Sequence, residues 1–190
     1  MVKKKILIVE GNTREENSEF TAVGINTHTE SLIESINFYK KDLDISIANP
    51  SSDNNLKNSI DSLDKYDGMI WGGSSLNIYN DTDEIRRQIS FMRECQLKIK
   101  KIFAICWGLQ VAVTVAGGQV KKSDKGAHRG IAHNIKVNNI GSNHKIYLNK
   151  KRQFNSPAFN FDEVVKIPEG ATLLSSNELN NVMGLNFKTN

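Results

Sequence analysis

Apolar residues along the first two thirds of the chain follow two alternating patterns. Short apolar or alternating runs, bounded by polar residues, have the length and composition of strands buried in a parallel sheet. These runs lie at 6–9, 44–49, 68–71 and 102–105. Between them, apolar residues recur every three or four positions, which predicts helices. The predicted helices lie around 32–39, 60–66, 85–92 and 109–116.

Polar segments and glycines separate these elements. Residues 10–26 are polar and irregular, so we expect a long first loop, and a second loop is expected at 50–55. Asp81 and Glu84 have the spacing of a capping box just before the third helix, although the box prefers Ser or Thr at its first position. The pair Gly117-Gly118 is expected to end the fourth helix.

From about Ile131, short strands replace the alternation of strands and helices. The expected strands are 134–137, 145–148, 164–167, 171–175 and 182–187. Alternating units followed by a β-rich half predict an α/β fold, with an open, mostly parallel sheet and helices on both faces. The sequence holds no internal repeat, and we interpret residues 1–190 as one domain.

The composition narrows the classes of protein to which the chain can belong. Its 190 residues, 38% hydrophobic and 24% charged, are typical of a globular protein with one core. The net charge of +4 is spread over short lysine clusters that we interpret as solvated surface, which argues against a nucleic-acid partner. No apolar run is long enough to cross a bilayer, and the run 6–9 is too short for a signal peptide. We therefore expect a cytoplasmic protein without a membrane partner.

The two cysteines differ in their positions within the predicted elements. Cys95 and Cys106 are too few for a disulfide framework and lack zinc-ligand spacing, so neither a metal nor another cofactor is expected. Cys95 lies within a predicted helix, and we interpret it as packing. Cys106 directly follows the strand 102–105. Ligands of such sheets bind beyond the carboxyl ends of the strands, where both Cys106 and the pair Gly72-Gly73 fall.

A cysteine on a sharp turn between a strand and a helix is well placed for nucleophilic chemistry. The turn forces the side chain outward, and the helix N-terminus lowers the pKa of the thiol. Free backbone N–H groups just after the cysteine can bind an oxyanion. Ala104 and Gly108, two residues to either side of Cys106, are the small neighbours that this turn needs. The alternative interpretation of Cys106 is a small core hydrophobe at the end of a buried strand.

Two short motifs resemble a known family. Residues 106–110, Cys-Trp-Gly-Leu-Gln, resemble the Cys-x-Gly-x-Gln signature of the class I (triad-type) glutamine amidotransferases. Residues 71–74, Trp-Gly-Gly-Ser, are similar to the glycine pair of that family. The stretch 74–79 looks like the one that follows this pair in relatives of the GMP synthase amidotransferase domain. Later stretches, at 159–164 and 168–177, are similar to family segments in the same order.

The resemblance implies a flavodoxin-like amidotransferase fold and a two-stage reaction with glutamine. Cys106 would attack the side-chain amide, release ammonia and leave a glutamyl thioester that water then hydrolyses. The pair Gly72-Gly73 and the N–H of Trp107 would form the oxyanion hole. Gln110, with Gly108, would bind and orient the glutamine. The ammonia would pass to a synthetase or another acceptor-modifying subunit.

The sequence departs from the family pattern at the catalytic base. A cysteine nucleophile of this type needs a base, usually a histidine oriented by a carboxylate. The family supplies both from a Gln-x-His-Pro-Glu-like motif after the last strands. Here no histidine follows His144, and Asn160 stands where relatives often have histidine. The open expectations are a chain truncated at its C-terminal end, a degenerate protein that binds glutamine or a partner, or a substitute histidine such as His128 or His133.

Three functions therefore compete. The first is a glutamine amidotransferase, and the second is a γ-glutamyl hydrolase or peptidase of the same fold that needs no acceptor subunit. The third is a binding module without turnover. A flavodoxin-like flavin binder is disfavoured, because the first loop, at 10–14, lacks the Ser/Thr-rich phosphate cradle that such a binder needs.

Overall fold

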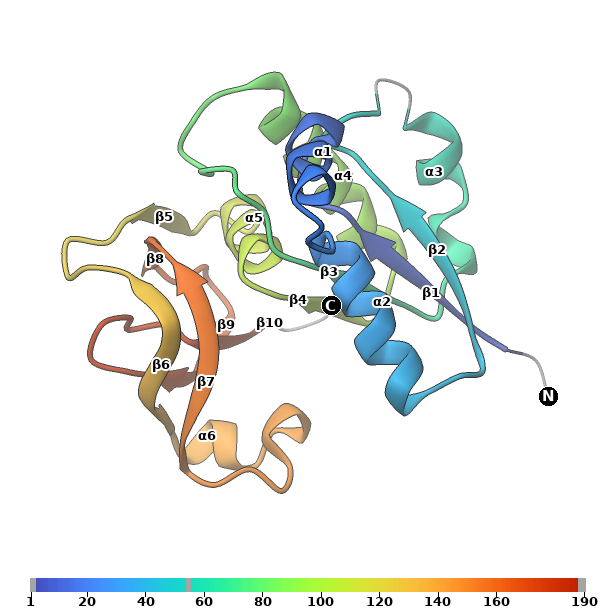
Figure 1. Cartoon of the computed structure of the whole chain (residues 1–190). Coiled ribbons are helices and arrows are strands. Elements are labelled where there is room, and N and C mark those ends of the chain that lie inside the picture. The colour runs from blue at the N-terminus through green and yellow to red at the C-terminus, as the bar shows by residue number, and fades with distance from the viewer. Residues whose placement is uncertain (1–2, 54–55, 188–190) are drawn as a thin grey trace. The chain divides into compact units, whose positions relative to one another are not determined.

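The computed structural model describes residues 3–53 and 56–187 (Figure 1). The chain divides into two compact units, Met1–Val115 and Ala116–Asn190. The interpretation of the whole chain as one domain stays a prediction. Over the described residues, none of the helices combines the length and the apolar character that a membrane span requires.

The first unit is built on a four-stranded parallel sheet with the strand order β2-β1-β3-β4. The strands are β1 (Lys4–Val9), β2 (Leu43–Ala48), β3 (Gly68–Trp71) and β4 (Ile102–Ala104). The register pairs Val9 with Trp71 and Trp71 with Ala104. The carboxyl ends of β1, β3 and β4 therefore lie next to one another at one edge of the sheet, as the sequence predicted for β3 and β4.

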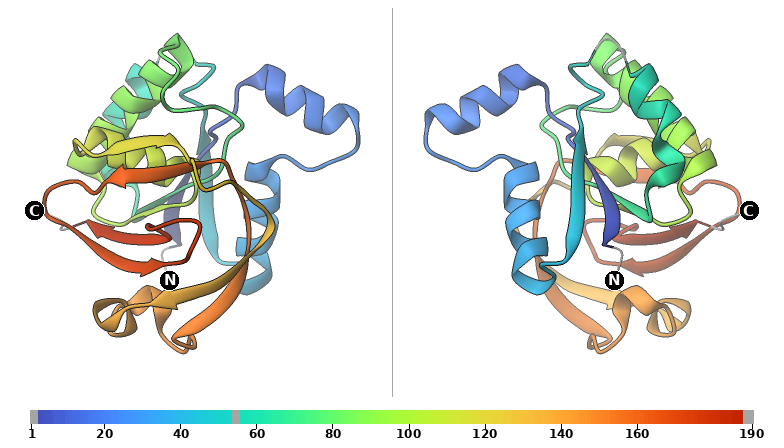
Figure 2. Two further views of the ribbon diagram at one scale, coloured as in Figure 1. Left: turned by 90° about the vertical axis from the view of Figure 1, so that its left-hand side faces the viewer. Right: turned by 90° about the vertical axis from the view of Figure 1, so that its right-hand side faces the viewer.

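Helices lie on both faces of this sheet. They are α1 (Arg14–Ala22), α2 (His28–Tyr39), α3 (Lys57–Asp61), α4 (Asp83–Lys98) and α5 (Trp107–Val115), with a short 3-10 helix, η1 (Leu63–Lys65). Figure 2 shows α2 on one side of the sheet and α4 on the other. The predicted α/β fold with a parallel sheet between helices is confirmed.

The core of the first unit lies where α4 and α5 cover the sheet. The rings of Trp71 on β3 and Phe91 on α4 meet edge to face with centroids 6.0 Å apart, and both side chains are fully buried. By contrast, α1 buries none of its side chains and α2 buries only Thr29. Hydrophobic burial therefore stabilises one face of the sheet much more than the other.

The second unit is antiparallel. One sheet has the strand order β10-β9-β6-β7, and a second pairs β5 with β8. The strands are β5 (Gln119–Lys122), β6 (His128–Val137), β7 (Gln153–Asn160), β8 (Asp162–Lys166), β9 (Ala171–Ser176) and β10 (Gly184–Phe187). Two short helices, α6 (Asn139–Ser142) and η2 (Lys145–Tyr147), connect β6 to β7. The predicted β-rich second half is confirmed.

Several local predictions were wrong. Residues 10–26 are not one loop, because α1 begins after a capping box at Thr13 and Glu16. The helix buries nothing, so the sequence carries no apolar stripe to reveal it. The strand expected at 145–148 is instead the helix η2. The helix expected at 60–66 is two pieces, α3 and η1, joined at Ser62.

The region before α4 also differs from its prediction. Thr82 is the N-cap of α4, and the expected capping box of Asp81 and Glu84 does not form. Asp81 instead accepts two hydrogen bonds from the guanidinium of Arg86, each 2.7 Å long. Of the loop expected at 50–55, residues 54–55 lie outside the described part of the chain.

The capping box of α2 yields a stability prediction. The hydroxyl of Thr27 accepts the N–H of Glu30 at 3.2 Å, and the Glu30 carboxylate accepts the N–H of Thr27 at 2.8 Å. Thr27→Ala should lower the free energy of unfolding by about 1 kcal/mol, because the backbone N–H of Glu30 loses its acceptor. Ser35→Ala, at an exposed position within the same helix, should change it by less than about 0.5 kcal/mol. Equal urea midpoints for the two variants would contradict the role of the cap.

Candidate functional site

Cys106 lies on the turn between β4 and α5, and it is exposed. Its backbone has a φ of 52°, in the left-handed region that residues other than glycine rarely adopt. Just before it, the N–H of Ile105 donates to the carbonyl of Trp71 at 2.8 Å. Just after it, the N–H of Gln110 donates to the carbonyl of Cys106 at 3.1 Å and begins the helix. The predicted sharp turn is therefore present, with its strain located at the cysteine itself.

Gly108 holds this turn against the end of β3. Its N–H donates to the carbonyl of Gly72 at 3.1 Å and to that of Ile105 at 3.0 Å. A Cβ at position 108 would lie 2.6 Å from the carbonyl oxygen of Trp71, so only glycine fits here. The first turn of α5 and the glycine pair after β3 are thus in direct contact, which brings the predicted residues of the two motifs together.

Several polar groups around the turn have unused hydrogen-bonding capacity. Within the described residues, the backbone N–H groups of Gly73 and Trp107 donate to no acceptor. The side-chain oxygen of Gln110 is buried and accepts no hydrogen bond from the same part of the chain. Buried polar groups without partners are rare in native proteins. A bound molecule that offers an oxyanion and an N–H donor would satisfy these groups.

A buried amide links this region to α4, and the sequence analysis missed it. Gln88 is fully buried, accepts a hydrogen bond from the indole N–H of Trp107 at 2.7 Å and donates one to the carbonyl of Gly11 at 3.0 Å. Its neighbours on the buried side of α4 are Ile85, Phe91, Met92 and Cys95. A glutamine within this otherwise apolar stripe was the signal available in the sequence.

His28 is the one histidine of the sequence that falls within the first unit. It is exposed at the start of α2, and its ring packs against Phe20 with centroids 5.5 Å apart. The imidazole also lies against Gly73, since a Cβ at position 73 would be 3.1 Å from Nδ1 of His28. Sequence reasoning did not select His28, because nothing local connects it to the glycine pair.

His128, in the second unit, is only 3% exposed and is held at both ring nitrogens. Its Nδ1 lies 2.9 Å from Oδ1 of Asn160, and its Nε2 lies 2.9 Å from Nδ2 of Asn177. The Asn177 amide nitrogen also donates to the carbonyl of His133, and the Asn160 amide nitrogen donates to that of Asp162. These carbonyls fix both amides, so Nδ1 of His128 donates to Asn160 and Nε2 accepts from Asn177. Both ring nitrogens of His128 are thus engaged in hydrogen bonds that support the structure.

The other two histidines of this unit have different surroundings. His133 is exposed, and its carbonyl is the acceptor for Asn177. His144 accepts the N–H of Ile146 at Nδ1, 3.3 Å away, and its Nε2 lies 3.3 Å from Oδ1 of Asn186. Neither arrangement is that of a histidine oriented by a carboxylate.

Cys95 contrasts with Cys106. Its side chain is fully buried on α4 among the core residues of the first unit. Burial raises the pKa of the Cys95 thiol to about 12, and the nearby carboxylate of Glu94 adds to the effect. The thiol therefore stays protonated at neutral pH, as expected for a packing residue.

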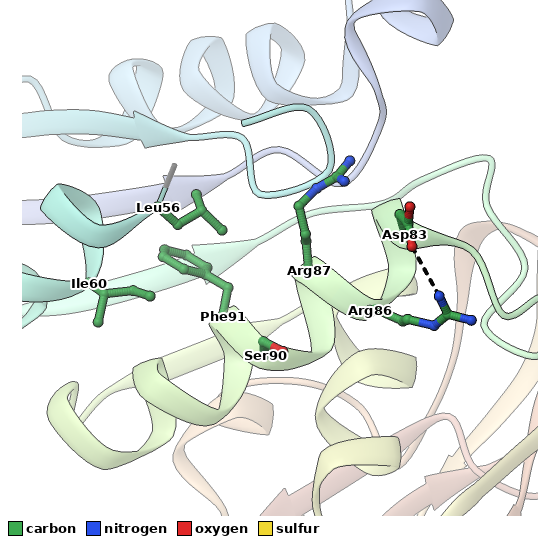
Figure 3. Close-up of a pocket in the computed structure, with 7 residues that line it drawn as sticks. All are labelled: Leu56, Ile60, Asp83, Arg86, Arg87, Ser90 and Phe91. Atoms are coloured by element: carbon green, nitrogen blue, oxygen red, sulfur yellow. Dashed lines mark hydrogen bonds and ion pairs between the residues drawn. The ribbon is translucent and has the colours of Figure 1, made fainter. Parts of the chain in front are cut away.

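A separate open pocket of about 290 Å³ lies between the start of α3 and α4 (Figure 3). Its lining residues are Leu56, Ile60, Asp83, Arg86, Arg87, Ser90 and Phe91, and they include none of the predicted site residues. The guanidinium of Arg86 is bound by Asp81 and Asp83, and that of Arg87 donates to the carbonyls of Pro50 and Ser51. Over residues 3–53 and 56–187, no group of three or more His, Cys, Asp or Glu side chains could hold a metal ion.

Comparison with known proteins shows which proteins this chain is similar to. The family model described as Glutamine amidotransferase class-I matches residues 25–190. The gamma-glutamyl-L-1-hydroxyisopropylamide hydrolase of a Pseudomonas species is 30% identical over 183 residues, which cover 93% of this chain and 60% of the relative. A glutamine-hydrolyzing GMP synthase subunit of Sulfolobus acidocaldarius is 27% identical over 120 residues, covering 63% of this chain and 60% of the relative. The chain thus spans less than two thirds of the length of these relatives.

Among solved structures, a glutamine amidotransferase from Thermotoga maritima shares the fold. It superposes with a TM-score of 0.74 at 15% sequence identity, over 98% of this chain and 73% of the other.

The close approach at Gly108 can be tested by a pair of variants. Gly108→Ala should destabilise the protein by about 1–3 kcal/mol, because the new methyl group meets a backbone carbonyl that cannot move aside. At Gly72 a Cβ would meet no atom within 4 Å, so Gly72→Ala should change the free energy of unfolding by less than about 1 kcal/mol. Thermal unfolding followed by circular dichroism measures both. A Gly108→Ala protein as stable as the wild type would rule out the close packing.

The contrast between the two thiols predicts selective labelling. In the folded protein, iodoacetamide should modify Cys106 and leave Cys95 intact, because only Cys106 is exposed. Peptide mapping by mass spectrometry identifies the labelled residue. After unfolding in guanidinium, both residues should react, which controls for intrinsic reactivity. Labelling of Cys95 as fast as Cys106 in the native protein would refute the assignment.

Proposed function

Because this chain belongs to the class-I glutamine amidotransferase family, we propose that it cleaves the side-chain amide of glutamine through a thioester on Cys106. The family match agrees with the resemblance of residues 106–110 and 71–74 and confirms the family predicted from them. The roles of individual residues, the acceptor of the ammonia and the identity of a partner are all parts of the proposal.

The single observation that carries the proposal is the exposed, left-handed Cys106 beside two N–H groups that have no acceptor in the described part of the chain. In the proposed reaction, the sulfur attacks the amide carbonyl carbon and its electron pair forms the C–S bond. The carbonyl oxygen becomes an oxyanion, which the N–H groups of Gly73 and Trp107 would stabilise. The C–N bond then breaks, and ammonia leaves with the proton that the Cys106 thiol gives up. Water then attacks the thioester carbonyl and the C–S bond breaks, so the hydroxyl group of the water completes glutamate and its proton returns to the sulfur as the thiol.

Gln110 and the glycines would shape the site for the glutamine. The buried oxygen of Gln110 lies one turn after the nucleophile and accepts from no donor among residues 3–53 and 56–187, so an N–H group of the substrate would satisfy it. Gly108 allows α5 to begin directly at β3, which keeps the N–H of Trp107 at the turn. Gly72 supplies the carbonyl that holds Gly108 and precedes the proposed donor Gly73.

We propose that the ammonia is passed to a synthetase subunit that modifies an acceptor. The similarity to a glutamine-hydrolyzing GMP synthase subunit supports this assignment, because that relative is named as one part of a larger enzyme. The proposed location is the cytoplasm, because reducing conditions there keep a nucleophilic thiol from being oxidised.

A γ-glutamyl hydrolase is the second candidate, and the similarity to the Pseudomonas hydrolase favours it. The acyl half of the substrate and the thioester would be the same in both reactions. Only the leaving group would differ, an alkylamine or an amino acid in place of ammonia, and no acceptor subunit would be needed.

Substrate comparison separates these functions. The full-length product of the gene should release ammonia from glutamine, and Cys106→Ala should lower the rate at least about a thousandfold, because the nucleophile is lost. Cys95→Ala is the control, and it should retain the activity. Faster release of amine from a γ-glutamyl alkylamide than of ammonia from glutamine would favour the hydrolase. Binding of glutamine without turnover would leave only the binding module, and equal rates for wild type and Cys106→Ala would exclude Cys106 as the nucleophile.

A further inference from the structure

We propose that Gln88 is a positioning residue that holds the two oxyanion donors, Gly73 and Trp107, at a fixed separation. The inference rests on the proposed function, because it concerns the same site. Gln88 lies on α4, and its amide connects the helix that begins after the nucleophile with Gly11 in the β1–α1 loop, whose carbonyl is also bonded by Ser74 of the glycine loop.

We call the hydrogen bonds that connect Trp107, Gln88, Gly11 and Ser74 the relay. Its first link joins Gln88 to Trp107. The indole N–H of Trp107 donates to Oε1 of Gln88 over 2.7 Å, and the two residues are 1% and 0% exposed. Because water is excluded, the bond is stronger than it would be at the surface. Trp107 directly follows Cys106 in the chain, so a fixed indole also fixes the main-chain N–H proposed as an oxyanion donor.

The second link joins Gln88 to the glycine loop through the carbonyl of Gly11. This carbonyl accepts one hydrogen bond from Nε2 of Gln88 at 3.0 Å and another from the hydroxyl of Ser74 at 3.1 Å. Ser74 immediately follows Gly73. Any displacement of the Gln88 amide would therefore be transmitted through one carbonyl oxygen to the residue beside the second proposed donor.

Gly11 itself packs closely between Gly73 and Trp107, the two residues proposed as oxyanion donors. A Cβ at position 11 would lie 2.7 Å from the carbonyl oxygen of Gly73 and 2.8 Å from Cδ1 of Trp107. Asn12 strengthens the same contact, since its side-chain oxygen accepts the N–H of Ser75 at 2.8 Å and the residue is fully buried. The β1–α1 loop thus lies between Gly73 and Trp107, and Gln88 bonds to Gly11 in this loop and to Trp107 on one side of it.

A packing role alone does not explain a glutamine at this position. Burying an amide without partners costs free energy, whereas leucine or methionine would fill the same place in the apolar stripe without that cost. Here both ends of the amide are bonded, and their direction is unambiguous. The indole of Trp107 can only donate, and the carbonyl of Gly11 can only accept. The relay is what the amide adds to the core.

Gln88→Met tests the relay, because methionine keeps the length of the side chain and removes both hydrogen bonds. The kcat for glutamine hydrolysis by the full-length protein should fall roughly 10- to 100-fold while KM changes by less than about threefold. Gln96→Met is the matched control, an exposed glutamine on the same helix, and it should retain the wild-type kcat. Thermal midpoints verify that both variants fold.

A spectroscopic measurement reports directly whether the hydrogen bond from Trp107 to residue 88 is lost. In an NMR spectrum of the indole N–H groups, the Trp107 signal should shift upfield in Gln88→Met, since its acceptor is gone, while the Trp71 signal should stay in place. Trp107→Phe assigns the two signals. A folded Gln88→Met protein with the wild-type kcat would overturn the proposal. A rise in KM by the same factor as the fall in kcat would overturn it as well.

If the proposed function itself is wrong, the activities of the variants differ from those expected above. If Cys106→Ala and the wild type are equally active or equally inactive, the function is wrong, and the relay is then judged by the reactivity of the Cys106 thiol. Without the relay, the N-terminus of α5 is less well held, so the apparent pKa of Cys106 from the pH dependence of iodoacetamide alkylation should rise in Gln88→Met. An unchanged alkylation profile would then refute the relay.

Discussion

The contact between Gly108 and the carbonyl of Trp71 is the constraint on which the arrangement of the first unit depends. With no side chain at position 108, α5 can begin directly against β3, and the chain between β4 and α5 must turn within two residues. The cost appears as the left-handed backbone of Cys106, of the order of 1–3 kcal/mol for a residue other than glycine. Hydrogen bonds from Ile105 and Gly108 to the end of β3 hold this conformation. The strain lies on the residue whose exposure the proposed chemistry requires.

The sequence was most informative where one structural requirement determines one residue type. Continuous apolar runs indicated β1, β3 and β4, because such runs are typical of strands in a parallel sheet. The rule that ligands gather at the carboxyl ends of such strands led to Gly72-Gly73 and Cys106 as neighbours, and the structure brings them together. Helix α1 was missed for the opposite reason, since a helix that buries nothing leaves no periodic pattern.

Other features depend on contacts between distant segments, which a single sequence does not display. The hydrogen bonds of His128 come from Asn160 and Asn177, which lie on other strands and loops. The partners of Gln88 come from residues 77 positions earlier and 19 positions later. Its place in an apolar stripe was visible, but the identity of its partners was not. The edge strand β7 contains Pro157 and is short of apolar residues, so its pairing with β6 was equally hidden.

The unequal burial on the two faces of the first sheet has a dynamic consequence. Helices α1 and α2 contribute almost no side chains to the core, so their local opening exposes little apolar surface and costs little free energy. The loop just before α1 is different, because Gly11 and Asn12 are anchored by buried hydrogen bonds to α4 and to the glycine loop. Amide protons of α1 should therefore exchange with solvent much sooner than those of β1, with a sharp boundary at Asn12. A helix that can open at little cost in free energy thus directly follows a loop that buried hydrogen bonds hold in place.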